Sequence, residues 1–184
     1  MNLSRERVGE IFIFFEAVLW GLFPVITVLS QNKLPTLISL GFSTLFASVF
    51  FSLVVSYKKK WHELKNIPAL RDILMATMIA GVFFYLLYFF GLRHTSPGNA
   101  SIIMLSEIFF SYLYFHVWRK DKLPTWHIAG AILMVIGGVI IFYPSFRQFQ
   151  FGDLMVLSAA FIAPFANFYQ KRARAKVSSE VIFF

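Results

Sequence analysis

Long apolar stretches alternate along this chain with short polar connections. Six stretches hold about 18 or more mainly apolar residues, the length at which an α-helix crosses the hydrocarbon core of a bilayer. The predicted spans are residues 8–30, 35–56, 73–92, 98–118, 125–144 and 153–170. A last apolar run, residues 181–184, begins a seventh. The pattern predicts an all-α polytopic transmembrane helix bundle of six spans plus the start of a seventh.

The connections between these spans place their basic residues almost entirely on one side of the predicted membrane. The amino terminus and the connections 57–72, 119–124 and 171–177 contain 14 of the 17 Lys and Arg residues. The three others are Lys33, Arg93 and Arg147. Because Lys and Arg are disfavoured in translocated loops, the basic side is predicted to be cytoplasmic. We expect a multi-pass protein of the cell inner (cytoplasmic) membrane with a cytoplasmic amino terminus.

Composition and charge narrow the class of protein further. Hydrophobic residues make up 58% of the chain and charged residues 14%, more apolar surface than a soluble domain of 184 residues can bury. The net charge of +8 belongs to short connections beside membrane helices, so it indicates membrane orientation and lipid headgroups, not nucleic acid. The sequence contains no Cys, no nucleotide-binding glycine motif and no paired histidines. We therefore expect no enzyme activity, no cofactor and no metal site.

Two local signals concern how the helices begin and pack. The tight connection 93–98 makes spans three and four an antiparallel pair, and Ser96 followed by Pro97 predicts a capped helix start. Gly130, Gly137 and Gly138 form a strip of small residues on span five. Such a strip predicts close packing of that helix against a neighbour.

The chain also contains a weak internal repeat at an offset of 143 residues, at which Gly9-Glu10-Ile11 aligns with Gly152-Asp153-Leu154. Five spans separate the two copies, so the second enters the membrane from the opposite side, as in inverted-repeat transporters. We expect residues 8–144 to form one five-helix repeat and residues 152–184 to form an incomplete second repeat. Doubling the offset implies a complete protein of about 286 residues and ten spans, of which this chain would contain six spans and the start of a seventh.

An incomplete second repeat has consequences for the isolated chain. We expect it to need the missing second repeat, or a homodimer partner, and to be inactive in transport without one. Span six would lack most of its packing neighbours, and Asn167 would face lipid.

A segment in the middle of the chain resembles a known family. Residues 91–103, then Leu105-Ser106-Glu107, and then residues 130–133 with Gly137 are similar to the second half of an EamA-type repeat of the drug/metabolite transporter superfamily. Trp20-Gly21 is similar to the family's usual opening. The resemblance covers essentially the whole chain and implies a membrane transporter of small molecules. One departure is Ile108, which stands where the family often has Pro and predicts a straighter span four.

Candidate chemistry lies in the two carboxylates that are well inside predicted spans, away from the membrane interfaces. A charged side chain at the bilayer centre costs about 2.5 to 3.5 kcal/mol, so such residues usually face a cavity or a partner. Glu107 is central in span four and shares one helix face with Met104 and Ser111. Glu16 lies in span one, four residues before Trp20, at a depth similar to that of Glu107.

These residues allow two interpretations. In the functional one, Glu16 and Glu107 line one cavity and bind a substrate cation or take up protons, while Trp20, Tyr85 and Tyr88 form an apolar wall. In the structural one, each carboxyl group only fastens neighbouring helices.

The function that these observations favour is secondary transport of small metabolites or drugs by alternating access, with proton or cation coupling. The alternative from another class is a non-transporting membrane scaffold or assembly protein. A small antiparallel homodimeric exporter would need balanced Lys and Arg, which the bias of 14 to 3 opposes.

The charge bias makes the topology testable. We expect alkaline phosphatase fused after Lys60 or Lys122 to be inactive, because these sites are predicted to be cytoplasmic, and a fusion after Arg147 to be active. Green fluorescent protein at the same sites is the complementary control. An exported reporter at Lys60 would overturn both the topology and the inverted repeat.

Overall fold

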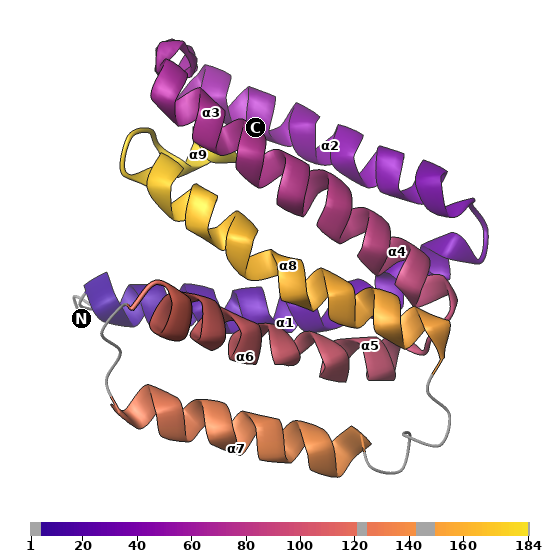
Figure 1. The fold of residues 1–184 in the computed structure, drawn as a ribbon. Coiled ribbons are helices and arrows are strands. Elements are labelled where there is room, and N and C mark those ends of the chain that lie inside the picture. Colours follow the sequence, from indigo (N-terminus) through magenta and orange to yellow (C-terminus); the bar gives the residue numbers. More distant parts are fainter. Residues whose placement is uncertain (1–4, 121–124, 143–149, 184) are drawn as a thin grey trace.

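The computed structural model describes residues 5–120, 125–142 and 150–183, and in parts of α1 and α7 only the backbone. The described chain consists of helices joined by short turns (Figure 1). The first elements are α1 (Arg5–Gln31), α2 (Thr36–Tyr57) and the 3-10 turn η1 (Trp61–Lys65). One long segment then comprises α3 (Ile67–Ala76), the π-helical η2 (Thr77–Phe84) and α4 (Tyr85–Arg93). The next comprises α5 (Pro97–Met104), α6 (Ser106–Tyr112) and the π-helical η3 (Leu113–Trp118). The last elements are α7 (Thr125–Phe142), α8 (Phe151–Arg174) and α9 (Ser179–Ile182).

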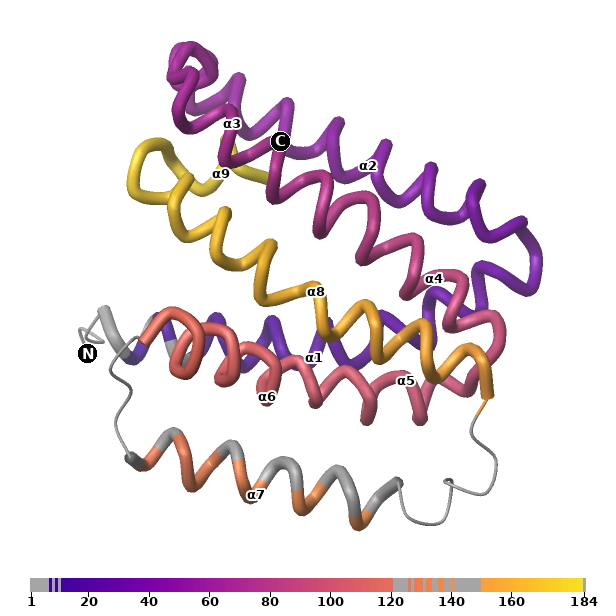
Figure 2. The backbone as a smooth tube through the Cα atoms, viewed as in Figure 1, coloured from indigo at the N-terminus to yellow at the C-terminus, as the bar shows by residue number. Residues whose placement is uncertain are grey.

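The helices form a bundle that α8 crosses through the middle. α8 packs against α3, η2 and α4 and also against α5 and α6. α1 contacts α2, α4 and α5. α7 contacts α5 and α6 and lies along one edge of the bundle, as the tube in Figure 2 shows.

The all-α polytopic prediction is confirmed. Five segments of the described chain are long and apolar enough to cross a membrane, and they correspond to predicted spans one to four and six. They are Ile11–Gln31, Thr36–Tyr57, Ile67–Arg93, Pro97–Trp118 and Phe151–Arg174. The remaining predicted span, residues 125–144, corresponds to α7, and its last two residues lie outside the described residues.

The third span begins at Ile67 and not at the predicted residue 73. Asn66 caps this helix by accepting a hydrogen bond of 3.2 Å from the N–H of Ala69, and Pro68 occupies its first turn. The charge of Asp72 makes this stretch resemble a loop in the sequence. In the structure Asp72 is buried and ion-paired, so the helix accommodates it.

The predicted cap of span four is confirmed, because the Ser96 side chain accepts a hydrogen bond from the N–H of Asn99 at 3.1 Å. Ile108, in place of the proline that the family often has after Glu107, predicts a straighter span four. The structure nevertheless interrupts this span at Leu105, between α5 and α6. The N–H of Leu105 bonds to the carbonyl three residues back, and Ser106 Oγ donates to the Ile103 carbonyl at 2.6 Å. These tighter bonds replace the regular α-helical ladder immediately before Glu107.

α8 is the most enclosed of the membrane-length helices. Its buried residues are mostly small, among them Gly152, Ala159, Ala160, Ala163 and Ala166. Small side chains let helix backbones approach closely where lipid provides no hydrophobic drive for association. The expectation that span six lacks most of its packing neighbours is therefore wrong. The small residues of α8 let it pack closely against spans three and four.

The closest approach of α8 involves two glycines. A Cβ atom added to Gly152 would lie 2.4 Å from the His94 carbonyl carbon, and one added to Gly91 would lie 2.8 Å from Val156 Cγ2. Only hydrogen fits at these two positions without displacement of the neighbouring atoms.

The glycines of α7 behave differently from those of the α4–α8 contact. Nothing described lies within 4 Å of a Cβ built on Gly130 or Gly137, and for Gly138 only the backbone is described. The close packing predicted for this strip is therefore wrong at Gly130 and Gly137. The physical reason is that α7 lies at the edge of the bundle, with α5 and α6 as its neighbours.

Ion pairs join α9 to the connection after α2 at the basic end of the bundle. Lys58 and Lys60 both bind the Glu180 carboxylate, the latter at 3.0 Å. Glu63 accepts a hydrogen bond from the N–H of Ser178 at 2.6 Å. The Lys58 ammonium lowers the pKa of Glu180 to about 2, and the Ser178 backbone N–H lowers the pKa of Glu63. These contacts connect parts of the chain more than 100 residues apart.

A second contact at this end joins α3 to the residues after α8. Asp72 is 2% exposed and lies 2.7 Å from Lys176 Nζ and 3.4 Å from an Arg172 guanidinium nitrogen. Lys176 also donates to the Pro68 carbonyl at 3.1 Å. A buried carboxylate is tolerated when cations and hydrogen bonds surround it in this way.

The glycine contact predicts a sharp difference between two Gly→Ala variants. We expect Gly152→Ala to destabilise the purified protein by about 2 kcal/mol or more, because overpacking against backbone atoms forces the two helices apart. Gly41→Ala on α2, where a Cβ meets nothing within 4 Å, is the matched control and should be neutral or slightly stabilising. Thermal unfolding in detergent measures both variants, and equal midpoints would contradict the close contact.

The ion pairs of α9 predict acid sensitivity. Ionised Glu63 and Glu180 stabilise the docked α9 fully above their ordinary pKa of 4.5, and this stabilisation is lost as the pH falls toward the lowered values. A nitroxide on Ser179→Cys in this otherwise cysteine-free chain should therefore gain mobility between about pH 5 and about pH 2.5. In a Glu63→Gln and Glu180→Gln background most of this change should disappear. Constant mobility of the label in the parent chain would contradict the role of the two carboxylates.

Candidate functional site

Glu107 lies in the first turn of α6, directly after the interruption at Leu105, and faces α8. Its Oε1 atom accepts a hydrogen bond of 3.2 Å from the side-chain amide of Asn167. In the described part of the chain no basic side chain is ion-paired with this carboxylate. Asn167, which the sequence placed against lipid, is exposed at its surface but is bound to Glu107. Glu107 is thus held by a neutral donor, which leaves its charge without a compensating cation.

The helix face that carries Glu107 contains residues in different surroundings. Met104 is 8% exposed and belongs to the apolar core of α4, α5 and α8, so it contacts packed side chains and not an open cavity. Ser111 is half-buried. Tyr114, two turns after Glu107, packs its ring 4.7 Å from that of Phe165 on α8. The sequence therefore predicted the shared face correctly, and the structure turns that face toward α8.

A column of stacked rings joins α1 to the third span. The Trp20 ring stacks on Phe23 at 5.2 Å, Phe23 stacks on Tyr88 at 5.9 Å, and Tyr88 stacks on Phe84 at 5.8 Å. Tyr85 meets the edge of Phe23 at 6.2 Å. The predicted aromatic residues thus lie together, with Phe23 as the link between them. Tyr88 is buried in the core, whereas Tyr85 is half-buried and Trp20 is exposed.

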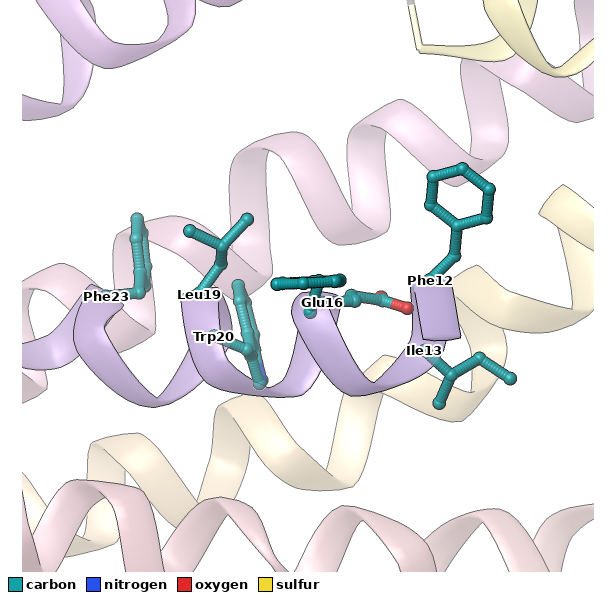
Figure 3. A pocket seen from close by; sticks show the side chains of 7 residues that line it. Phe12, Ile13, Glu16, Leu19, Trp20 and Phe23 are labelled. Atoms are coloured by element: carbon teal, nitrogen blue, oxygen red, sulfur yellow. The ribbon is translucent and has the colours of Figure 1, made fainter. Parts of the chain in front are cut away.

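An open groove of about 570 Å³ lies against α1 beside this column (Figure 3). Its lining residues are Phe12, Ile13, Phe15, Glu16, Leu19, Trp20 and Phe23. All of them belong to α1, and Glu16 is the one that can carry charge. Figure 3 shows the Glu16 side chain extending along the helix toward Phe12 and Ile13. The groove is therefore an apolar surface with a single carboxylate.

The predicted site residues fall into two groups in the structure. Glu16 and Trp20 line the groove on α1, whereas Glu107 is bound to Asn167 between α6 and α8. Glu107 is not among the residues that line the groove. A cavity shared by both carboxylates stays a prediction. Among the described residues there is also no group of three or more His, Asp or Glu side chains that could hold a metal ion.

Sequence reasoning missed the importance of two residues, Phe23 and Asn167. Phe23 is one of 24 phenylalanines, and its only signal was a position three residues after Trp20 on the same helix face. Asn167 had a clearer signal, because an amide inside an apolar span needs a hydrogen-bond partner. The partner itself could not be read from the sequence, since 60 residues separate Asn167 from Glu107.

A comparison with known families identifies the family of this chain. Residues 7–143 match the EamA-like transporter family, and this range extends from the start of α1 to the end of α7. Neither curated proteins nor solved structures give a significant match. The match covers well over half of the chain and confirms the resemblance that its sequence motifs indicate. The chain therefore belongs to the EamA-like transporter family, the multi-pass membrane transporters of the drug/metabolite transporter superfamily.

Proposed function

We propose that this chain forms part of a secondary transporter that moves a small metabolite or drug across the inner membrane by alternating access. Membership of a transporter family supports the general activity. The specific proposal assigns the binding of a substrate cation, or of the coupling proton, to Glu107. Glu16 and the aromatic residues around Trp20 would form a second part of the same pathway.

The observation that carries this proposal is the position of Glu107 on an interrupted helix. Glu107 is at the middle of the membrane-length segment Pro97–Trp118, two residues after the tighter, 3-10-type turn at Leu105. Secondary transporters typically bind substrate and coupling ions near the membrane midplane, where helices are discontinuous. An ionisable side chain at that depth marks a functional site by default, because insertion of its charge is costly. Its observed partner is a neutral amide, so the carboxylate retains the capacity to bind a cation or a proton.

The aromatic column favours an organic substrate over a simple inorganic ion. Trp20 is 42% exposed on the groove, and its stacking partner Phe23 connects it to Tyr85 and Tyr88. Aromatic faces attract organic cations, and a nearby carboxylate adds charge complementarity. The proposed substrate is accordingly a small organic molecule, with a cationic or hydrogen-bonding group directed to Glu107 or Glu16.

The directions of α1 and α8 support the inverted repeat. α1 begins at the basic end of the bundle, whereas α8 ends there (Figure 2). Residues 8–144 would be the first repeat and residues 152–184 the start of the second. A second repeat, or a homodimer partner, would supply the opposite wall of the groove on α1. Alternating access would then arise from movement of one repeat against the other.

The decisive variant is Glu107→Gln in the full-length protein. Gln keeps the shape of Glu and can accept the Asn167 hydrogen bond, but it cannot bind a proton or balance a cation. We expect transport in proteoliposomes to fall to the level of empty vesicles, with thermal stability unchanged. Flux is measured for a panel of labelled amines, amino acids and nucleosides, together with a trapped pH dye.

Glu180→Gln is the matched control, because it removes the same charge from a half-buried position outside the membrane-length segments. It should transport at the parent rate. Parent-like flux in Glu107→Gln would assign Glu107 to helix packing alone. A parent protein that moves no compound of the panel would favour the alternative function, a non-transporting membrane scaffold.

A further inference from the structure

A cluster of basic side chains lies where η3 and α8 come together at the basic end of the bundle. Arg119 follows η3 directly, and Lys171 and Arg172 belong to the last turns of α8. These residues lie at the ends of two membrane-length segments, Pro97–Trp118 and Phe151–Arg174. The cluster therefore lies at the depth where a helix leaves the hydrocarbon core.

Aromatic rings hold these cations close together. The Arg119 guanidinium carbon lies 4.6 Å from the centroid of the Phe168 ring, and the Arg172 guanidinium carbon lies 5.6 Å from the same centroid. Lys171 Nζ lies 5.9 Å from the centroid of Phe115. Each distance is within the range of about 6 Å over which the negative face of a ring attracts a cation. Arg119 and Arg172, from two different elements, thus meet at one ring, and Lys171, next to Arg172 in the chain, contacts a second.

The described part of the chain does not neutralise this cluster. Arg172 lies 3.4 Å from Asp72, but Asp72 is already bound by Lys176 at 2.7 Å. Arg119 and Lys171 form no ion pair with a described carboxylate. Like charges held together repel one another, so the arrangement is stabilised by an anion. All three side chains are exposed and accessible to one.

The surroundings indicate which anion fits. Guanidinium groups bind phosphate oxygens through paired hydrogen bonds, and lysine adds a compact charge. Trp118, adjacent to Arg119, is 70% exposed, and exposed Trp at the end of a span typically marks the headgroup region of a bilayer. A phosphate at this depth belongs to a phospholipid, and basic pockets between transmembrane helices on the cytoplasmic side bind such headgroups.

We propose that Arg119, Lys171 and Arg172 form a binding site for the phosphate group of an anionic phospholipid in the cytoplasmic leaflet. Phe115 and Phe168 orient the three cations, and the adjoining apolar surface contacts the glycerol and the upper acyl chains. The lipid joins the ends of η3 and α8 without any direct ion pair between these helices. The site is separate from Glu107 and does not depend on the transport mechanism.

The test compares phosphatidylglycerol with phosphatidylcholine and with inorganic phosphate. Each is titrated into the purified chain in detergent, and the thermal unfolding midpoint is measured. We expect phosphatidylglycerol alone to raise the midpoint saturably. In Arg119→Gln with Lys171→Gln, the half-saturating lipid concentration should rise by at least about tenfold, because each basic residue near a membrane contributes to the binding of anionic lipid. Arg172 is left intact because of its contact with Asp72.

Lys65→Gln with Arg71→Gln is the matched control. It removes one Lys and one Arg from the same predicted side of the membrane, at exposed positions that are not part of the cluster. Its half-saturating concentration should change by less than about twofold. The charge-conserving exchange Arg119→Lys with Lys171→Arg should retain binding. If the neutral variant is less stable without lipid, native mass spectrometry of bound phosphatidylglycerol replaces the midpoint as the readout.

Three results would overturn the proposal. Equal effects of phosphatidylglycerol and phosphatidylcholine would show that the site does not recognise an anionic headgroup. Equal weakening in both pairs of neutral variants would show diffuse attraction by the whole basic face. Saturable stabilisation by inorganic phosphate that abolishes the lipid effect would show a site for a soluble anion.

Discussion

The close approach of α4 and α8 at Gly91 and Gly152 places α8 inside the bundle, and several other contacts depend on that position. In a bilayer the hydrophobic effect does not drive helices together, so helix association depends on van der Waals contact and on hydrogen bonds between helices. The small residues of α8 provide the first of these. From this position Asn167 reaches Glu107 on the fourth span. Phe168 likewise contacts Arg119, the residue that follows the fourth span.

The two ends of the bundle are joined by different interactions. At the basic end, ion pairs connect α9 and the end of α8 to α3 and to the connection after α2. At the opposite end no ion pair is present among the described residues. Ser30 bonds to Ser39 at 2.8 Å, the Gln31 amide donates to the Phe89 carbonyl at 2.9 Å, and charged groups take part through single hydrogen bonds from Arg93 to Thr36 and from Thr95 to Asp153. Ion pairs weaken with salt and with acid, whereas neutral hydrogen bonds respond to neither directly.

Glu107 and Asp72 show two ways in which an acid is accommodated within a packed bundle. A nearby cation would stabilise the charge of Glu107 and occupy the position that a substrate would need. An amide donor orients the carboxylate and leaves it available for a cation. Asp72 illustrates the opposite solution, since Lys176 and Arg172 both contact it and join two helices through it. The two buried or half-buried acids therefore serve different purposes, which their partners define.

The sequence alone was sufficient for the helical class, the approximate spans and the face of span four that carries Glu107. These properties depend on local periodicity and hydropathy, which each segment carries independently of its neighbours. The sequence did not predict the correct start of span three. The charge of Asp72 makes residues 67–72 resemble a loop, and the partner that neutralises it, Lys176, lies 104 positions further along the chain. For the same reason the sequence could not place span six in the middle of the bundle or identify Asn167 as the partner of Glu107. Which glycines pack closely was also decided by the fold, since Gly130 and Gly152 differ only in whether a neighbouring helix lies against them. Contacts between distant segments are set by how whole helices fit together, and no single stretch of sequence contains that information.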